Sequence, residues 1–329
     1  MHFMYKLLKP LRLAGLMLFS ILPVAGWSQT AMEQAIVLAT GSGQIQGTLR
    51  MPEAAHKVPV ILIIAGSGPT DRDGNSAGLA GRNDSLKMLA ESLAQSGCAS
   101  VRFDKRGIAA SKSAAGMESD LRFEAYVNDA ADWLRMLTAD ARFSGVGILG
   151  HSEGSLIAML AAQKVAVKAV ISIAGPAQNA ADILRQQLAG KLPPALAEKN
   201  EAVLASLQAG KTYSEVPPEL FSLYRPSVQA YLISWFRYVP AQEIAQLKVP
   251  VLILQGEQDI QVSAAQAEAL KKARPDAVLQ LIPGMNHVLK IVGSDQAKQM
   301  ASYHDPAMPL APALALALKS FLAQAMPLT

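Results

Sequence analysis

The sequence predicts an α/β protein in which helices cover both faces of a mostly parallel central sheet. Beyond residue 58, short continuous runs of Val, Ile and Leu alternate with amphipathic helical segments. Continuous apolar runs of this kind are typical of parallel strands that are buried on both faces. The chain has 329 residues, of which 51% are hydrophobic and 17% are charged. This composition supports a substantial core and excludes global disorder.

The elements are expected in a regular order. A hairpin over residues 35–51, turning at Gly41–Gly43, precedes a buried strand at 59–66. An amphipathic helix then starts at Asp84 and stops at Gly97. The remaining alternation predicts strands at 98–104, 146–150, 167–175, 249–256 and 277–284, with helices at 123–137, after Ser152, at 263–273 and at 312–325.

The N-terminal segment has the pattern of a secretory signal peptide at residues 1–28. Three basic residues precede an apolar stretch at 13–22, and small residues follow up to Ser28, where we expect cleavage. The apolar stretch is too short to span a bilayer comfortably. We therefore expect a periplasmic or secreted mature domain at residues 29–329 without stable membrane insertion. An uncleaved N-terminal anchor is the alternative.

The mature domain is nearly neutral. The formal net charge of the full chain is +4, and removal of the signal leaves 27 basic residues against 26 acidic ones. A balance this even predicts no nucleic-acid or anionic-membrane partner. The single cysteine, Cys98, cannot form an intramolecular disulfide and is expected to be a buried small residue.

One long interval, between Gly175 and Val249, lacks strand signals and predicts a helical cap insertion at about 176–247. Five apolar residues there recur at helical spacing and give one apolar face, namely Tyr224, Val228, Tyr231, Leu232 and Trp235. We favour the interpretation that this face packs on the main domain. The alternative is that Tyr231 and Trp235 roof a substrate pocket.

The stretch VGILGHSEGSLIAML, residues 146–160, joins a buried strand to a helix through a turn that contains Ser152. It matches the G-x-S-x-G nucleophile elbow, in which a sharp turn exposes the serine hydroxyl above the start of a helix. Glycines at 150 and 154 relieve crowding there. The five-residue pattern is weak alone, so the assignment depends on a base, an acid and an oxyanion hole elsewhere in the chain.

Two later strand ends supply the missing partners. Asp259 follows the strand in LILQGEQDIQV, and His287 follows the strand in LQLIPGMNHVL. Ligands bind beyond the carboxyl ends of parallel strands, and the order Ser, Asp, His is that of α/β-hydrolases. A serine hydroxyl needs a neutral imidazole to accept its proton, and the imidazole needs a carboxylate to fix its tautomer. The competing residues are His304 for the base and Glu257, Asp276 and Asp295 for the acid.

An oxyanion hole needs two backbone N–H donors. We assign one to Glu153, the residue after the nucleophile, and the other to Ser67 in the loop IIAGSGPTDRDGN, with Gly68 as the competitor. The Glu153 carboxylate itself is sufficiently explained by the favourable helix dipole. The loop lacks the ending of a phosphate-binding P-loop and the twelve-residue pattern of a calcium loop. Asp104, Arg106 and Gly107 are expected to buttress it by ion pairing.

The segments AGSGPTDRDGN, RFDKRG, GHSEG, GEQD and GMNHVLK together resemble secreted or periplasmic bacterial α/β-hydrolases with esterase activity, a group related to dienelactone-hydrolase and acyltransferase-like enzymes. The resemblance covers nearly all of residues 35–325. It implies an α/β-hydrolase fold, with Ser152 as nucleophile, Asp259 as acid, His287 as base and the loop at 66–68 as oxyanion contributor. Dienelactone hydrolases proper use a cysteine nucleophile, so the serine argues against their lactone substrate.

We therefore expect a serine hydrolase of small or short-acyl carboxylic esters that uses no cofactor and no metal. A peptidase or amidase acting on small exported substrates would use the same triad. It needs a site for a charged amine, and the cap offers no obvious acidic cluster. A catalytically silent binding protein on the same scaffold is a third hypothesis, and the complete set of triad residues argues against it.

Overall fold

A computed structural model of the chain describes residues 32–54, 56–78 and 80–327. The predicted signal peptide at residues 1–28 lies outside them. The described residues belong to one compact unit with an eight-stranded sheet in the order β1-β2-β4-β3-β5-β6-β7-β8. Its strands are β1 (Met32–Thr40), β2 (Gly43–Met51), β3 (Val58–Ile64), β4 (Ala99–Phe103), β5 (Phe143–His151), β6 (Val170–Ile173), β7 (Val251–Gly256) and β8 (Val278–Ile282).

The sheet is mostly parallel, as predicted. β1 and β2 form the expected antiparallel hairpin, in which Thr40 pairs with Gly43, and β2 runs antiparallel to β4. From β4 onward all neighbouring strands are parallel. Their carboxyl ends therefore meet along one edge of the sheet, where the loops after β3, β4, β5, β7 and β8 come together.

Helices connect the strands. They are α1 (Ser85–Gln95), α2 (Phe123–Ala139), α3 (Glu153–Lys164), α4 (Ala180–Leu188), α5 (Pro194–Gln208), α6 (Phe221–Tyr224), α7 (Pro226–Trp235), α8 (Pro240–Gln246), α9 (Ala264–Ala273), α10 (Gln296–Ala301) and α11 (Pro312–Ala325), with short 3-10 helices η1 (Ala109–Ala114), η2 (Glu118–Asp120) and η3 (Pro218–Leu220). The predicted helices after Asp84, at 123–137, after Ser152, at 263–273 and at 312–325 correspond to α1, α2, α3, α9 and α11. The short α10 was not predicted.

The core has two halves, one on each face of the sheet. Every residue of β3 is buried, with alternate residues in the two apolar clusters. One cluster joins Ile61 and Ile63 to α1 and α11, and the other joins Val60 and Leu62 to α2, α3 and α9. Burial of both faces explains why the strands read as continuous apolar runs rather than alternating ones.

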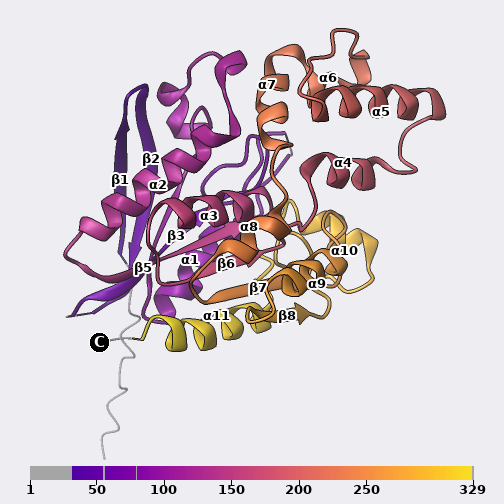
Figure 1. The fold of residues 1–329 in the computed structure, drawn as a ribbon. Coiled ribbons are helices and arrows are strands. Elements are labelled where there is room, and N and C mark those ends of the chain that lie inside the picture. Colours follow the sequence, from indigo (N-terminus) through magenta and orange to yellow (C-terminus); the bar gives the residue numbers. More distant parts are fainter. Residues whose placement is uncertain (1–31, 55, 79, 328–329) are drawn as a thin grey trace, which may run out of the picture. The chain divides into compact units, whose positions relative to one another are not determined.

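Helices α4–α8, drawn in red to orange in Figure 1, occupy the interval between β6 and β7. The single apolar face predicted there is wrong at one position, because Tyr224 ends α6 and Pro226 begins α7. The extended backbone of Arg225 separates the two helices (φ −48°, ψ 147°). Tyr224 is buried and its hydroxyl pairs with Asn200 Oδ1 at 2.8 Å, so it belongs to the packing of the cap. Within the described ranges no helix is long and apolar enough to cross a bilayer.

Candidate active site

The predicted elbow lies between β5 and α3, with Ser152 at the turn. Ser152 has φ 55° and ψ −121°, a conformation that is sparsely populated for a residue with a side chain. Its N–H donates to Ile173 O at 2.9 Å, and its carbonyl accepts from Ser155 N at 3.0 Å. A side chain at Gly150 would meet Gly154 O at 2.0 Å. The turn therefore requires glycine at 150, as the motif predicts.

The loops after β7 and β8 bring Asp259 and His287 together. His287 Nδ1 donates to Asp259 Oδ2 at 2.7 Å, and both side chains are almost completely buried. Asp259 also accepts from the backbone N–H groups of Gln261 and Val262, at 2.8 and 3.0 Å. Because Nδ1 carries the hydrogen, Nε2 of the neutral ring is left as an acceptor for a proton.

The surroundings of Asp259 keep its carboxylate ionised. Burial by itself raises the pKa of Asp259. His287 and the backbone N–H groups of Val262 and Gln261 lower it more, so the pKa lies below its ordinary value. An ionised carboxylate here fixes the His287 tautomer and would stabilise an imidazolium.

The competing candidates are exposed or paired elsewhere, and Glu257 is among the exposed ones. His304 is exposed and lies against Gly81. Asp276 pairs with Arg274 at 2.8 Å, and Asp295 accepts from Lys298 N at the start of α10. Among the described carboxylates, only that of Asp259 contacts the His287 ring.

His287 lies next to the elbow through the residue that precedes Ser152. His151 Nε2 donates to the His287 carbonyl at 2.8 Å, and the two ring centroids are 4.8 Å apart. Gly66, in the loop after β3, closes the other side of the turn, because a Cβ there would lie 3.2 Å from Ser152 Cβ. The structure thus brings the predicted nucleophile, base, acid and oxyanion loop to one end of the sheet.

The predicted oxyanion residues border a cavity beside Ser152. Ser67, Gly68 and Glu153 all line it, so both candidates for the second donor are present. Within the described ranges, the backbone N–H groups of Ser67, Gly68 and Glu153 donate to no protein atom. Free donors next to a nucleophile are what a tetrahedral oxyanion requires.

The cavity has a volume of about 290 Å³ and reaches from the elbow to the cap. Tyr231 and Trp235 of α7 line it, as one of the two predicted alternatives requires. Trp235 also stacks on Phe123 of α2, with centroids 5.8 Å apart and planes 6° apart. Trp235 therefore lines the cavity and also packs on the main domain.

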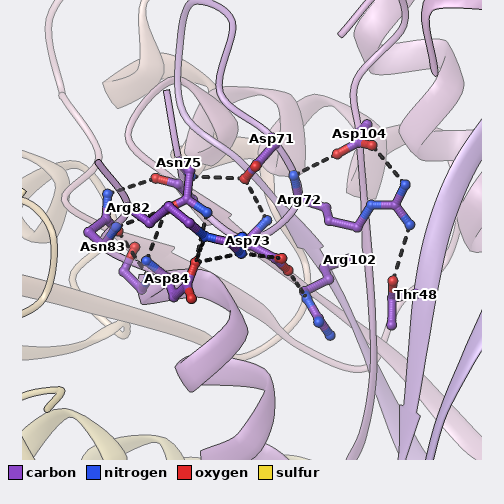
Figure 2. Close-up of polar contacts among 12 residues, drawn as sticks. Thr48, Asp71, Arg72, Asp73, Asn75, Arg82, Asn83, Asp84, Arg102 and Asp104 are labelled. Carbon is purple, nitrogen blue, oxygen red and sulfur yellow. Dashed lines mark hydrogen bonds and ion pairs between the residues drawn. The ribbon is translucent and has the colours of Figure 1, made fainter. Parts of the chain in front are cut away.

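The loop after β3 is held by polar contacts that Figure 2 shows. Asp104 accepts from the backbone N–H of Arg72 at 2.8 Å and from its guanidinium at 2.7 Å, which is the predicted buttress. The Asp71 carboxylate accepts from Asp73 N and Asn75 N, both at 2.9 Å. The prediction is wrong for the other two residues, because the Arg106 guanidinium pairs with Asp129 of α2 and the Gly107 N–H donates to Ser111 O at 3.1 Å.

Comparison with known proteins decides the family. The family model described as serine aminopeptidase, S33, matches residues 76–291, about two thirds of the chain. The chain belongs to this family. Over 248 residues it is 25% identical to esterase EstD of Thermotoga maritima, a match that covers 74% of this chain and 58% of EstD.

Solved structures show that this S33 family member has the α/β-hydrolase fold. Est1E of Butyrivibrio proteoclasticus with bound ferulic acid has a TM-score of 0.60 at 21% identity, covering 89% of this chain and 99% of that one. The α/β hydrolase GrgF of Penicillium sp. sh18 has a TM-score of 0.58 at 16% identity, covering 90% and 100%. The predicted fold class is therefore confirmed.

The S33 protein also has a buried charged group that the sequence interpretation missed. The Glu153 carboxylate, explained above by the helix dipole alone, is buried and pairs with Lys105 Nζ at 2.9 Å. It accepts a second hydrogen bond from the Tyr231 hydroxyl. The dipole explanation is therefore incomplete. The available signal was the position of Lys105, which directly follows Asp104 just after strand β4.

His151 predicts a pH dependence of stability. Burial, with a contribution from neighbouring His287, lowers the pKa of His151 to about 3. An unfolded histidine has a pKa of about 6.5, so between these two pKa values the unfolded chain binds one more proton than the folded chain. The free energy of unfolding should therefore fall with falling pH, by at most about 1.4 kcal/mol per pH unit from this residue.

We expect His151→Gln to reduce that slope across about pH 4 to 6, because glutamine can keep a donor to the His287 carbonyl and does not titrate. Urea unfolding at several pH values measures it. Equal slopes in the two proteins would show that His151 titrates normally in the folded state.

Proposed function

We propose that the protein is a serine hydrolase of carboxylic esters. Ser152 Oγ attacks the ester carbonyl, His287 Nε2 takes the hydroxyl proton and Asp259 stabilises the resulting imidazolium. The N–H groups of Ser67 and Glu153 bind the oxyanion. His287 passes the proton to the leaving alcohol and then activates the water that releases the acid. The observation that carries this proposal is the buried His287–Asp259 pair beside a strained serine elbow that borders an apolar cavity.

The cavity favours a small ester with an uncharged acyl group. Its walls are largely aliphatic, with Leu156, Ile183, Leu184, Leu223, Val228 and Leu232 among them. Arg225, the one cation among the described residues that line the cavity, is paired with Glu118 of η2. A volume near 290 Å³ lies at the lower end of ligand sites, which are commonly ~300–1,000 Å³.

The same lining argues against an aminopeptidase, although the family description carries that word. An aminopeptidase needs an acidic group for the substrate's free ammonium. Among the described residues that line the cavity, Glu153 is the only acid, and Lys105 and Tyr231 already occupy its carboxylate. A relation to the dienelactone-hydrolase-like enzymes is part of this proposal and rests on the sequence segments alone.

The test is turnover of the purified domain on matched esters and amides. The ester series should run from acetyl to octanoyl and include an aromatic acid ester, since Est1E has the same fold and binds ferulic acid. Esters of short or aromatic acids should be hydrolysed and the matched peptide amides should not. Faster cleavage of the amides would replace the proposal with the amidase, and binding without turnover would favour the silent scaffold.

We expect Trp235→Ala to shift acyl preference toward longer chains, because removal of the indole lengthens the apolar cavity. In this variant each methylene that enters the lengthened cavity should favour the longer ester over the shorter one by about 1–3 kcal/mol. The measurement is kcat/KM across the ester series. Tyr238→Ala is the matched control, because Tyr238 contacts Phe123 from the same cluster but does not line the cavity. An equal loss on every chain length would make Trp235 a packing residue only.

We also propose that residues 1–28 direct export, so that the enzyme acts in the periplasm or outside the cell. The support is the basic, then apolar, then small-residue pattern of this segment. Expression of the full chain in a bacterium, followed by fractionation and N-terminal mass analysis, tests it. An intact chain in the cytoplasm contradicts export.

A further inference from the structure

Lys105 is almost fully buried at the end of the sheet, one residue past the Asp104 that follows β4. Its side chain is 2% exposed. The ammonium donates to the Gly66 carbonyl at 2.6 Å and to Glu153 Oε2 at 2.9 Å, and lies 5.0 Å from the centre of the Tyr126 ring. Burying a charge is costly unless it is paired and hydrogen-bonded, and each of these contacts compensates it.

The two partners of Lys105 belong to the two sides of the proposed oxyanion hole. The Gly66 carbonyl and the Ser67 N–H are parts of one peptide plane, and in a trans peptide they point in opposite directions. Holding the carbonyl toward Lys105 therefore directs the Ser67 N–H away from it. Ser67 lines the cavity beside Ser152, and its N–H has no partner among the described residues. The other proposed donor is the N–H of Glu153, whose side chain the same ammonium holds.

Tyr231 extends this connection to the cap. Its hydroxyl donates to Glu153 Oε1, and its ring packs edge-on against Tyr126 at 5.7 Å. The chain of contacts thus runs from α7 through Glu153 and Lys105 to the loop after β3. None of these side chains needs to contact the reacting atoms to affect the reaction.

We propose that Lys105 is a positioning residue that fixes both backbone donors of the oxyanion hole through one ammonium group. The inference rests on the proposed ester hydrolase function. Preorganised donors stabilise the transition state more than the bound ester, so loss of the ammonium should lower kcat and leave KM nearly unchanged. If the ion pair were merely structural, its loss would lower the melting temperature without lowering kcat selectively over KM.

The experiment compares Lys105→Met with Arg106→Met. Methionine keeps an unbranched apolar side chain and removes the charged group. Arg106 is the adjacent residue and pairs with buried Asp129 rather than with Gly66 or Glu153, so its loss also leaves a buried carboxylate without its cation. We expect Lys105→Met to lower kcat by about 10- to 100-fold, below the ~10²- to 10³-fold loss for removing a donor outright. Arg106→Met should lower the melting temperature and leave kcat unchanged.

A trifluoromethyl ketone matched to the best ester gives a second readout, because its adduct with serine carries the oxyanion. Its inhibition constant should rise in Lys105→Met by the same factor as kcat falls. If the single variant does not fold, Lys105→Met with Glu153→Gln removes both charges and keeps an acceptor for Tyr231. Unchanged kcat in the folded variant, or a kcat loss without weaker ketone binding, would overturn the role of Lys105. A wild-type protein that hydrolyses no ester would instead contradict the proposed function.

Discussion

Ser152→Ala should abolish ester hydrolysis, lowering kcat by about four to six orders of magnitude. The hydroxyl is the only group in the proposed mechanism that forms the acyl-enzyme, and methyl cannot replace it. A fluorophosphonate probe should label the wild-type protein at Ser152 and leave the variant unlabelled. Circular dichroism should show an unchanged fold, because alanine retains the Cβ that the turn already accommodates.

Two comparisons sharpen this prediction. Ser155→Ala removes a neighbouring hydroxyl, whose bonds to Gly150 O and Ser172 Oγ are structural, and should keep the labelling. The double variant Ser152→Ala with His287→Ala should be little worse than either single variant, because the residues of a triad act as a unit. Labelling at another serine, or additive losses, would show that Ser152 is not the nucleophile.

The fold was predictable because strands β3, β4, β6 and β7 at the centre of the sheet are buried on both faces. Such strands appear as uninterrupted apolar runs, and the helices between them keep clear periodicity with recognisable ends. Asp84 shows the limit of this reasoning. It stands where α1 begins, yet it has φ 50° and its carboxylate accepts from Asn75 and Arg82 rather than capping the helix. The aspartate in the sequence located the N-terminus of the helix but did not reveal which contacts stabilise that N-terminus.

The positions of Ser152, Asp259 and His287 were predictable for a related reason. Each follows a strand, and parallel strands place their carboxyl ends along one edge of the sheet. The loop contacts that align these residues were harder to predict from the sequence, because they depend on the relative positions of segments that lie far apart in the chain. The His287–Asp259 pair joins residues 28 positions apart, whereas the Lys105–Glu153 pair joins residues 48 apart and has no motif to announce it.

The cap was the least predictable region. The spacing of its apolar residues suggested one helical face, but Pro226 starts a new helix and turns the chain between Tyr224 and Val228. Tyr231 was predicted to line a pocket, and it does, but its hydroxyl also reaches Glu153 of α3. Helical periodicity reports which residues are buried and not which distant element buries them.

His287→Ala should lower kcat by about three to six orders of magnitude, whereas His304→Ala should change it little. His287 donates through Nδ1 to Asp259 and keeps Nε2 as the proton acceptor. It is the only described imidazole that a buried carboxylate orients. His304 is an exposed residue against Gly81 and provides the matched control. The decisive measurement is single-turnover acylation with a chromogenic ester, which isolates the step in which the Ser152 proton is removed. A larger loss in His304→Ala than in His287→Ala would assign the base to the loop before α11 and remove Asp259 from the mechanism as well.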